Sequence, residues 1–252
     1  MYLNRTNVLI LAGGLGTRLS EETHDKPKPM VQIGDYPILK HLIDIFCLQG
    51  FSQFVVATGY MSYVIEEWAE KANSYPVGTY FSSKFIKPEI VCLDTGIDTQ
   101  TGGRIKHALE FLKNQRIIAT YGDGLGNVNL ESLVNYHISS RKLATVTAVH
   151  PPARFGYLKF TEDGLVTHFG EKNQADSGWI NGGFFVLEPE VKNFIDDYSE
   201  PFESGALPRL VSKKELGSYL HDGFWQPIDT LREKKELDSF ASINPPPWLK
   251  NI

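Results

Sequence analysis

The residues best suited to chemistry lie in two short segments near the start of the chain. The first, Leu11–Leu19, reads Leu-Ala-Gly-Gly-Leu-Gly-Thr-Arg-Leu. Its three glycines let the backbone approach an anion with N–H groups pointing inward, and Arg18 adds a fork of positively charged donors. The second, Lys26–Met30, holds two lysines between prolines, which keep them extended and off a helix. These residue types at this spacing favour a phosphate-binding site.

The glycine-rich segment matches neither of the two common phosphate motifs. No Lys-Ser/Thr pair follows it, as a Walker A loop requires, and Leu19 stands where the third glycine of a dinucleotide fingerprint belongs. Each segment also has a plain structural interpretation: a tight strand-to-helix turn for the glycines, and a solvated charged loop for the lysines. From the residues alone, both interpretations stay open.

Two carboxylates are candidates for a metal site. Asp123 lies between two glycines, Gly122 and Gly124, after an apolar run, and Asp229 precedes Thr230. Mg²⁺ takes one or two carboxylates together with phosphate oxygens, so this pair suits it. The structural alternatives are a turn at Asp123 and a helix N-terminus at Asp229-Thr230. If both bind one ion, they must converge on one side of the site. Two unneutralised carboxylates would repel there, and the shared cation removes that repulsion.

Other segments combine glycines with polar or aromatic residues. Thr101-Gly102-Gly103-Arg104 is a second glycine-rich turn with an arginine, and it can equally be a helix start with Thr101 as N-cap. The segments 179–184 and 223–230 place polar groups beside aromatic residues, which suits a sugar-like ligand. The seven histidines form no metal-ligand or nucleophile pattern, so we expect them to be structural or solvated.

The order of apolar runs predicts how these segments are positioned. Val8–Ala12 is an unbroken apolar run closed by glycines, as in a strand buried on both faces of a parallel sheet. Strands are expected at 54–58, 89–93, 117–121 and 145–149, and helices at 38–49, 63–72, 103–113 and 130–140. This alternation predicts an α/β fold with a doubly wound, mostly parallel sheet, whose catalytic loops lie at the carboxyl ends of the strands.

The second half of the chain is expected to contain more β-structure. A hairpin is predicted at 156–160 and 165–169 around an Asp-Gly turn, and a strand at 184–187. Helices are expected at 189–197, 207–214 and 230–240, whereas the prolines in 244–248 exclude a helix or a central strand there. No repeat or linker divides the chain, so we expect a single domain over residues 1–252.

Composition narrows the class of protein. The chain has 252 residues, with Lys+Arg 25 against Asp+Glu 30, and this net charge of −5 argues against binding nucleic acid by broad charge attraction. No apolar run approaches the roughly 20 residues of a membrane span. Cys47 and Cys92 have apolar neighbours and no CxxC spacing, so buried free thiols and a reducing, cytoplasmic location are expected.

Taken together, these segments resemble the sugar-1-phosphate nucleotidylyltransferases, and within them the glucose-1-phosphate cytidylyltransferase branch. The resemblance runs through nearly the whole chain, and its blocks occur in the order expected of that branch. They are 11–23, 26–30, 94–96, 101–104, 121–124, 154–156, 180–187 and 223–232. It implies a Rossmann-like nucleotidyltransferase fold with a small β-rich, sugar-binding portion.

The resemblance also implies a role for particular residues. Arg18 and Lys28 would be catalytic, with Lys28 on the phosphate of the sugar, and Asp123 and Asp229 would hold Mg²⁺. Glu171, Lys172 and Asn181 would bind the second substrate. The residues implied for nucleotide binding are Leu11, Ala12, Gly13, Gly14, Gly16, Thr17, Thr99, Arg104 and Gly122.

The activity implied is transfer of CMP from CTP to a phosphorylated substrate, with α-D-glucose 1-phosphate as the first choice. Alternatives are another sugar phosphate or a non-sugar phosphate of capsule or lipopolysaccharide synthesis, and a non-catalytic nucleotide-sugar-binding homologue. The resemblance further implies a homo-oligomer with no nucleic-acid or membrane partner. One departure bears on this: between Trp68 and Asp94 the chain is shorter than the family pattern, which leaves the subunit count and the exact substrate open.

Overall fold

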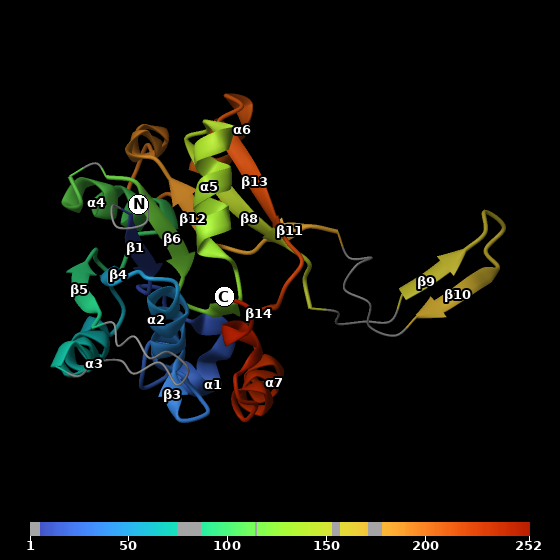
Figure 1. Ribbon diagram of the computed structural model, residues 1–252, viewed down its shortest axis with the longest axis horizontal. Helices are drawn as coiled ribbons and strands as arrows, with labels where there is room; N and C mark the ends of the chain where they lie inside the picture. Colours follow the sequence, from blue (N-terminus) through green and yellow to red (C-terminus); the bar gives the residue numbers. More distant parts are fainter. Residues whose placement is uncertain (1–5, 75–86, 114, 153–156, 171–177) are drawn as a thin grey trace.

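An eight-stranded sheet forms the centre of the molecule (Figure 1). The computed structural model describes residues 6–74, 87–113, 115–152, 157–170 and 178–252. Along the main path the strands are β11 (Ile180–Asn181), β8 (Ala144–Val149), β12 (Phe185–Leu187), β6 (Ile117–Tyr121), β1 (Asn7–Leu11), β4 (Gln53–Thr58) and β5 (Glu89–Asp94), with β13 (Leu216–His221) also paired to β8. Strands β6, β1, β4 and β5 are parallel to one another, and so are β8 and β13.

Helices cover both faces of this sheet, because its central strands are apolar on both sides. In β1, Val8 and Ile10 belong to one buried cluster, and Leu9 and Leu11 to the other. Helices α2 (Ile38–Leu48), α3 (Ser62–Ser74) and α5 (Leu130–Ser140) contribute to the first cluster, and α4 (Thr101–Phe111) and α6 (Ala206–Ser212) to the second. The predicted doubly wound, mostly parallel sheet is therefore confirmed.

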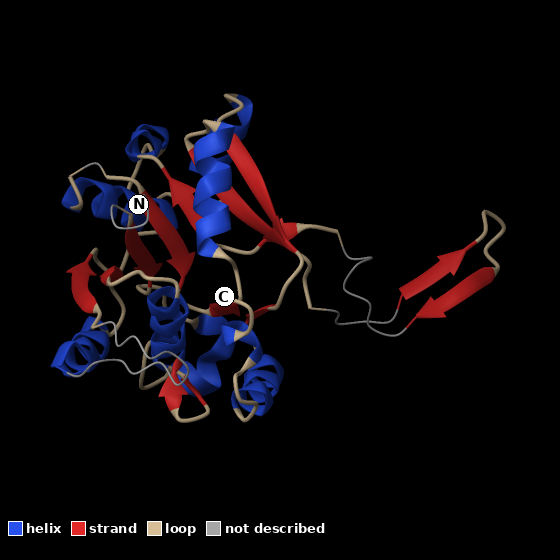
Figure 2. Cartoon of the chain, viewed as in Figure 1, coloured by secondary structure: helices blue, strands red, loops and turns tan. Residues whose placement is uncertain are grey.

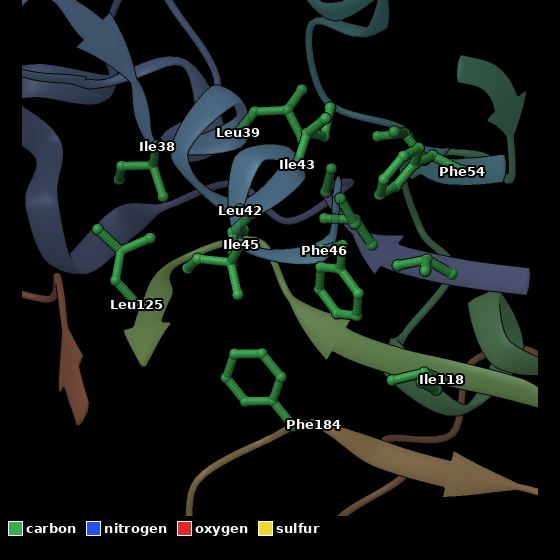
Figure 3. Close-up of a cluster of buried hydrophobic side chains, with 14 of the residues drawn as sticks. Ile38, Leu39, Leu42, Ile43, Ile45, Phe46, Phe54, Ile118, Leu125 and Phe184 are labelled. Atoms are coloured by element: carbon green, nitrogen blue, oxygen red, sulfur yellow. The ribbon is translucent and has the colours of Figure 1, made fainter. Parts of the chain in front are cut away.

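Helix α2 lies at the centre of the first cluster (Figure 3). Its Phe46 ring lies 6.2 Å from that of Phe54 on β4 and 6.0 Å from that of Phe184, which precedes β12. Full burial of each large apolar side chain contributes about 1.5–3 kcal/mol. The helix ends before Gly50, whose φ of 93° lies in the left-handed region that glycine adopts without strain. The rings of Phe54 and Phe184 thus pack α2 against the sheet beneath its loops.

Three two-stranded sheets lie outside the central one (Figure 2). They pair β2 (Gln32–Ile33) with β3 (Tyr36–Pro37), β7 (Gly124–Gly126) with β14 (Trp225–Pro227), and β9 (Tyr157–Phe160) with β10 (Val166–Gly170). The remaining elements are α1 (Ser20–Thr23), α7 (Leu231–Ala241) and short 3₁₀ turns at Thr17–Leu19, Lys28–Met30, Pro189–Phe194 and Pro247–Leu249. Pair β9–β10 confirms the predicted hairpin, and β7–β14 shapes the site.

Several predictions of local structure need correction. Residues 189–194 form a 3₁₀ turn rather than a helix to 197, and strand β13 was not expected. The segment expected to be free of helix carries a 3₁₀ turn that begins at Pro247, where a proline is tolerated because the first N–H is unpaired anyway. Both cysteines are free thiols, but Cys92 is only half-buried. Among the described helices, none is long and apolar enough to cross a bilayer.

Candidate active site

A cavity of about 620 Å³ opens at the carboxyl ends of β1 and β6. Its described lining comes mainly from six segments that the sequence analysis singled out, together with Glu203, which belongs to none of them. The lining residues are Leu11 to Arg18, Lys28, Pro29, Ile97, Thr99 to Thr101, Arg104, Tyr121 to Asp123, Asn181, Glu203, Trp225, Pro227 and Asp229. This is the place at which open α/β sheets bind their ligands.

The first glycine-rich turn forms one wall of the cavity, and its backbone is partly free. Gly14 has nothing within 4 Å of the position a Cβ would occupy. Gly16 has a φ of 66°, which a residue with a side chain rarely adopts, and its carbonyl accepts a hydrogen bond from the Thr23 hydroxyl at 3.0 Å. The turn can therefore expose backbone N–H groups to a bound anion without a side chain intervening.

Lys28 connects the two candidate metal ligands. Its Nζ lies 2.7 Å from Asp123 Oδ2 and 2.6 Å from Asp229 Oδ1, and its side chain is 9% exposed. Arg18, 72% exposed at the mouth, donates from Nη1 to Asp229 Oδ2 at 2.6 Å. Both carboxylate oxygens lie within hydrogen-bond reach of one nitrogen, so they are at most about 5.3 Å apart. The predicted convergence of the two carboxylates is confirmed.

Pairing of two short strands brings the two aspartates together across a long stretch of sequence. Gly124 of β7 pairs with Pro227 of β14, and the Ile228 N–H donates to the Asp123 carbonyl at 2.9 Å. Asp229 follows directly, and its own N–H donates to Glu233 Oε2 at 2.8 Å. Thr230 caps helix α7 by accepting from the Glu233 N–H. The structural and functional interpretations of Asp229-Thr230 therefore hold together: the threonine caps, and the aspartate faces the cavity.

The donor set is suited to a cation bound jointly with phosphate. No group of three or more His, Cys, Asp or Glu side chains that could hold a metal exists in the described part of the chain. An all-protein metal cage is thus absent there, whereas Mg²⁺ commonly uses two carboxylates and completes its shell with phosphate oxygens and water. The ammonium group of Lys28 already lies between the two carboxylates, at a position that attracts a cation.

The second glycine-rich turn serves packing. A Cβ on Gly103 would lie 2.1 Å from the Tyr198 carbonyl oxygen, and one on Gly102 would lie 2.6 Å from the Glu200 carbonyl oxygen. The Gly102 N–H donates to Glu200, and the Gln100 N–H donates to Tyr198. These two glycines therefore let the chain at 198–200 dock against the start of α4. Thr101 is not the N-cap: Gln100 takes that position, and the Thr101 hydroxyl is bonded elsewhere.

Arg104 is buried behind the first turn, with 3% of its surface exposed. Its guanidinium donates to the Gly13 carbonyl at 2.9 Å, to the Thr58 carbonyl at 2.7 Å and to the Thr95 hydroxyl. Burial lowers the pKa of Arg104, and the neighbouring Asp94 partly offsets this. Arg104 thus lines the cavity and holds the first glycine-rich turn against β4. Contact with a nucleotide stays a prediction for this residue.

A polar chain of side chains crosses another wall. Asn181 donates from Nδ2 to the Tyr121 hydroxyl at 3.1 Å, and its Oδ1 accepts from the Gly183 N–H at 2.9 Å. The Tyr121 hydroxyl donates to Glu203 Oε1 at 2.5 Å. Burial, together with the negative charge of Glu203, raises the pKa of Tyr121, so the phenol stays protonated and acts as a donor.

The structure places nearly all of the expected site residues along this one cavity. Those that line it are Leu11, Ala12, Gly13, Gly14, Gly16, Thr17, Arg18, Lys28, Thr99, Arg104, Gly122, Asp123, Asn181 and Asp229. Glu171 and Lys172 lie outside the described residues, and so do Arg154 to Gly156. Glu203 was missed, because no motif surrounds it and only the docking of 198–200 on α4 brings it to the wall.

Comparison with known proteins finds a family model and curated relatives that match most of this chain. The model of the nucleotidyl transferase family matches residues 7–234. The glucose-1-phosphate cytidylyltransferase of Salmonella typhi is 40% identical, with 95% of this chain and 97% of the relative covered. A probable glucose-1-phosphate cytidylyltransferase of Bacillus subtilis is 38% identical, with 95% and 98% covered.

Solved structures share the fold at lower identity. HddC from Yersinia pseudotuberculosis, also solved in complex with GMP-PN, superposes with a TM-score of 0.69 at 23% identity and covers 93% of this chain and 98% of its own. A UDP-glucose pyrophosphorylase in complex with UDP-glucose gives a TM-score of 0.68 at 18% identity, with 93% and 97% covered. At these identities the structures speak for the fold alone.

Proposed function

The chain belongs to the nucleotidyl transferase family, and on that premise we propose that it transfers CMP from CTP to α-D-glucose 1-phosphate, releasing pyrophosphate and forming CDP-glucose. The observation that carries the proposal is the Lys28–Asp123–Asp229 cluster beside an open glycine-rich turn in one cavity. The near-full-length similarity to glucose-1-phosphate cytidylyltransferases supports the choice of nucleotide and sugar.

The reaction needs two anionic phosphates brought together. An oxygen of the sugar phosphate attacks the α-phosphorus of CTP in line, the new P–O bond forms, and the bond to the pyrophosphate oxygen breaks. Arg18 and Lys28 supply the positive charge that offsets repulsion between the two anions. Lys28 has three donors, and the structure gives two of them to carboxylates, which leaves one for a phosphate oxygen.

Asp123 and Asp229 would hold Mg²⁺ together with phosphate oxygens of the bound nucleotide. When bound, the ion supplies charge neutralisation to the phosphates. The chain's own part is to keep the two carboxylates converged, which it does through β7, β14 and the capped start of α7. Titration calorimetry with Mg²⁺ and a non-hydrolysable CTP analogue tests this directly. Asp123→Asn and Asp229→Asn should each weaken uptake of the ion while the melting temperature changes little.

A panel of nucleotides tests the proposed function. The protein is incubated with CTP, UTP, ATP or GTP and glucose 1-phosphate, and pyrophosphate release is followed with and without a chelator. CTP should be the preferred nucleotide, and activity lost to the chelator should return with Mg²⁺. A second panel replaces glucose 1-phosphate by other sugar phosphates and by non-sugar phosphates. Equal turnover of CTP and ATP would contradict the proposed base preference, and no turnover with any pair would contradict enzymatic function.

We keep three finer expectations as proposals: a cytoplasmic location, a homo-oligomeric state, and a place in capsule or lipopolysaccharide (O-antigen) synthesis. Light scattering of the purified protein tests the second. A monomer at micromolar concentration would contradict it. The first rests on the free thiols, and the third on the kind of product that a sugar nucleotidylyltransferase supplies to polysaccharide assembly.

A further inference from the structure

Glu203 is a carboxylate of the cavity wall for which neither the phosphate chemistry nor the aspartate pair provides a role. Its main chain is held firmly. The neighbouring Phe202 is 1% exposed, and its ring lies 5.5 Å from that of Phe185 on β12. The Phe202 N–H donates to Thr101 Oγ1 at 2.8 Å, which links this turn to the start of α4. The position of Glu203 is therefore set both by the core and by a helix.

The carboxylate itself is held from two sides. Oε1 accepts from the Tyr121 hydroxyl at 2.5 Å, and Oε2 accepts from the Thr101 hydroxyl at 2.6 Å. An ionised carboxylate has about four lone-pair positions, so two of them remain after these bonds are made. Both donors also line the cavity. Glu203 is thus an oriented acceptor at the wall with capacity for a further donor.

The negative charge of Glu203 limits which part of a substrate can supply the further hydrogen-bond donor. Phosphate groups are attracted by Arg18 and Lys28 and repelled by a carboxylate, so the part of a substrate that faces Glu203 must be neutral. Both proposed substrates carry neutral hydroxyl donors, on the hexose ring and on the ribose. The cytosine amino group is a further neutral donor, and deoxy analogues distinguish the hydroxyls from it. A hydroxyl donating to a carboxylate makes a short, strong hydrogen bond. The pairing also orients the substrate, with its phosphate away from Glu203.

We propose that Glu203 is a specificity-determining residue that accepts a hydrogen bond from a hydroxyl group of a bound substrate. The donor belongs either to the sugar ring of the sugar phosphate or to the ribose of the nucleotide. The identity of these substrates rests on the proposed function, whereas the need for a neutral donor rests on the contacts of Glu203. The packing of residues 198–200 on Gly102 and Gly103 brings the Glu203 carboxylate to the cavity.

Deoxy analogues test the proposal. We compare kcat/KM for each substrate with that of its monodeoxy analogues: 2′- and 3′-deoxynucleotide on one arm, and deoxyglucose 1-phosphates on the other. The nucleotide used is the one that the wild-type protein turns over fastest. Wild type should lose about tenfold or more on one analogue, because that analogue leaves Glu203 without its partner. In Glu203→Ala, the same analogue and its parent should react at nearly equal rates, and the arm that changes identifies the substrate.

Asp196→Asn is the matched control. Asp196 is a carboxylate seven positions before Glu203, and it pairs with Arg209 rather than lining the cavity. This control variant should discriminate as wild type does, and Glu203→Gln should fall between wild type and Glu203→Ala. If Glu203→Ala rejects every analogue as strongly as wild type, or wild type rejects none, the proposal is overturned while the proposed function stands. Failure of CTP as a substrate would instead overturn the cytidylyl transfer alone, because the discrimination is read with the preferred nucleotide.

Discussion

The two glycine-rich turns of this chain look alike in sequence and differ in the structure. Both hold glycines followed by an arginine. In the first, Gly14 is open and Arg18 lies 72% exposed at the mouth of the cavity. In the second, Gly103 is covered by the backbone of 198–200, and Arg104 is 3% exposed. One turn leaves its backbone and its charge open to the cavity, and the other serves as a docking surface for another segment.

The difference shows that a glycine in a motif has two distinct uses. Absence of a Cβ lets either a ligand or another chain segment approach, and the sequence does not say which. The two arginines differ in the same way, one being open to the cavity and the other packed against the chain. A guanidinium whose donors go to backbone carbonyls orders the chain, whereas an exposed one beside a carboxylate is free to exchange partners. Substitutions that separate stability from activity can break or sharpen this comparison.

The largest effect is expected at Gly103. A methyl group in Gly103→Ala would meet the Tyr198 carbonyl oxygen, so 198–200 must shift away from α4. We expect a loss of about 3 kcal/mol in the free energy of unfolding, near 10 °C in melting temperature. Gly14→Ala is the matched control, because nothing lies within 4 Å of the position that the new methyl group would occupy. This variant should melt like wild type and raise the KM for the nucleotide. Equal melting temperatures for the two variants would contradict the assignment.

Lys28 should show a similar free-energy effect, but in turnover. Lys28→Ala removes a charge-assisted contact to phosphate in a partly closed site, which costs about 2.7 kcal/mol, or roughly a hundredfold in kcat/KM. Lys26→Ala, in the same segment but paired with Asp25 outside the cavity, serves as control and should retain activity. Circular dichroism checks folding of both. A near-wild-type rate for Lys28→Ala would show that Lys28 only joins the two carboxylates and does not act on the phosphates.

Substitution of Arg104 should lower stability, whereas substitution of Arg18 should lower activity. Arg104→Ala removes the charged donor from the carbonyls of Gly13 and Thr58, which keep only the neutral donors of Tyr60 and Thr95. Loss of these buried charge-assisted bonds should cost about 2 kcal/mol in the free energy of unfolding. Arg18→Ala should leave the melting temperature unchanged and lower kcat/KM about tenfold. Denaturant unfolding and pyrophosphate release are measured on both variants. Loss of stability in Arg18→Ala with none in Arg104→Ala would reverse the comparison.

The last effect concerns stability alone and lies at a lysine–aspartate pair in the core, which contrasts with the Lys28 cluster in the cavity. Asp44 on α2 is 3% exposed and lies 2.6 Å from Lys40. Burial raises the pKa of Asp44 to about 6, against the opposing effect of Lys40. The folded protein thus favours the neutral acid, and the stability this adds is present below about pH 4 and lost as the pH rises through 6.

Asp44→Asn removes this titration. The free energy of unfolding of wild type, minus that of Asp44→Asn, should therefore fall as the pH rises from about 4 to 7. Denaturant melts at several pH values measure it, and the rate of the reaction should not follow the same curve. A difference that rises over this pH range would contradict the raised pKa.

Sequence patterns predicted correctly those parts of the molecule in which the local residue pattern matches the tertiary contacts that the segment makes. The apolar run of β1 and its closing glycines fall on a central strand, and Asp123 and Asp229 converge as expected. Strand β13, with a glycine inside and half-exposed side chains, lacks the apolar run that marks a buried strand. It forms because β8 offers a pairing edge.

Glu203 and the second glycine-rich turn show why part of the site lay beyond sequence reasoning. The glycines at 102 and 103 are explained only by the carbonyls of Tyr198 and Glu200, nearly a hundred residues away. Glu203 stands among ordinary turn residues, and Phe202 determines its direction through the core. Such features depend on contacts that no local spacing encodes.

The fate of the α-phosphate of CTP tests the central claim most directly. The protein is incubated with [α-³²P]CTP, with and without glucose 1-phosphate, and the label is followed in nucleotide, sugar nucleotide and protein. Direct transfer in the cavity predicts that the label enters CDP-glucose only when the sugar phosphate is present, and that protein and pyrophosphate stay unlabelled. Label bound to the protein, or exchange of pyrophosphate into CTP without the sugar phosphate, would contradict it.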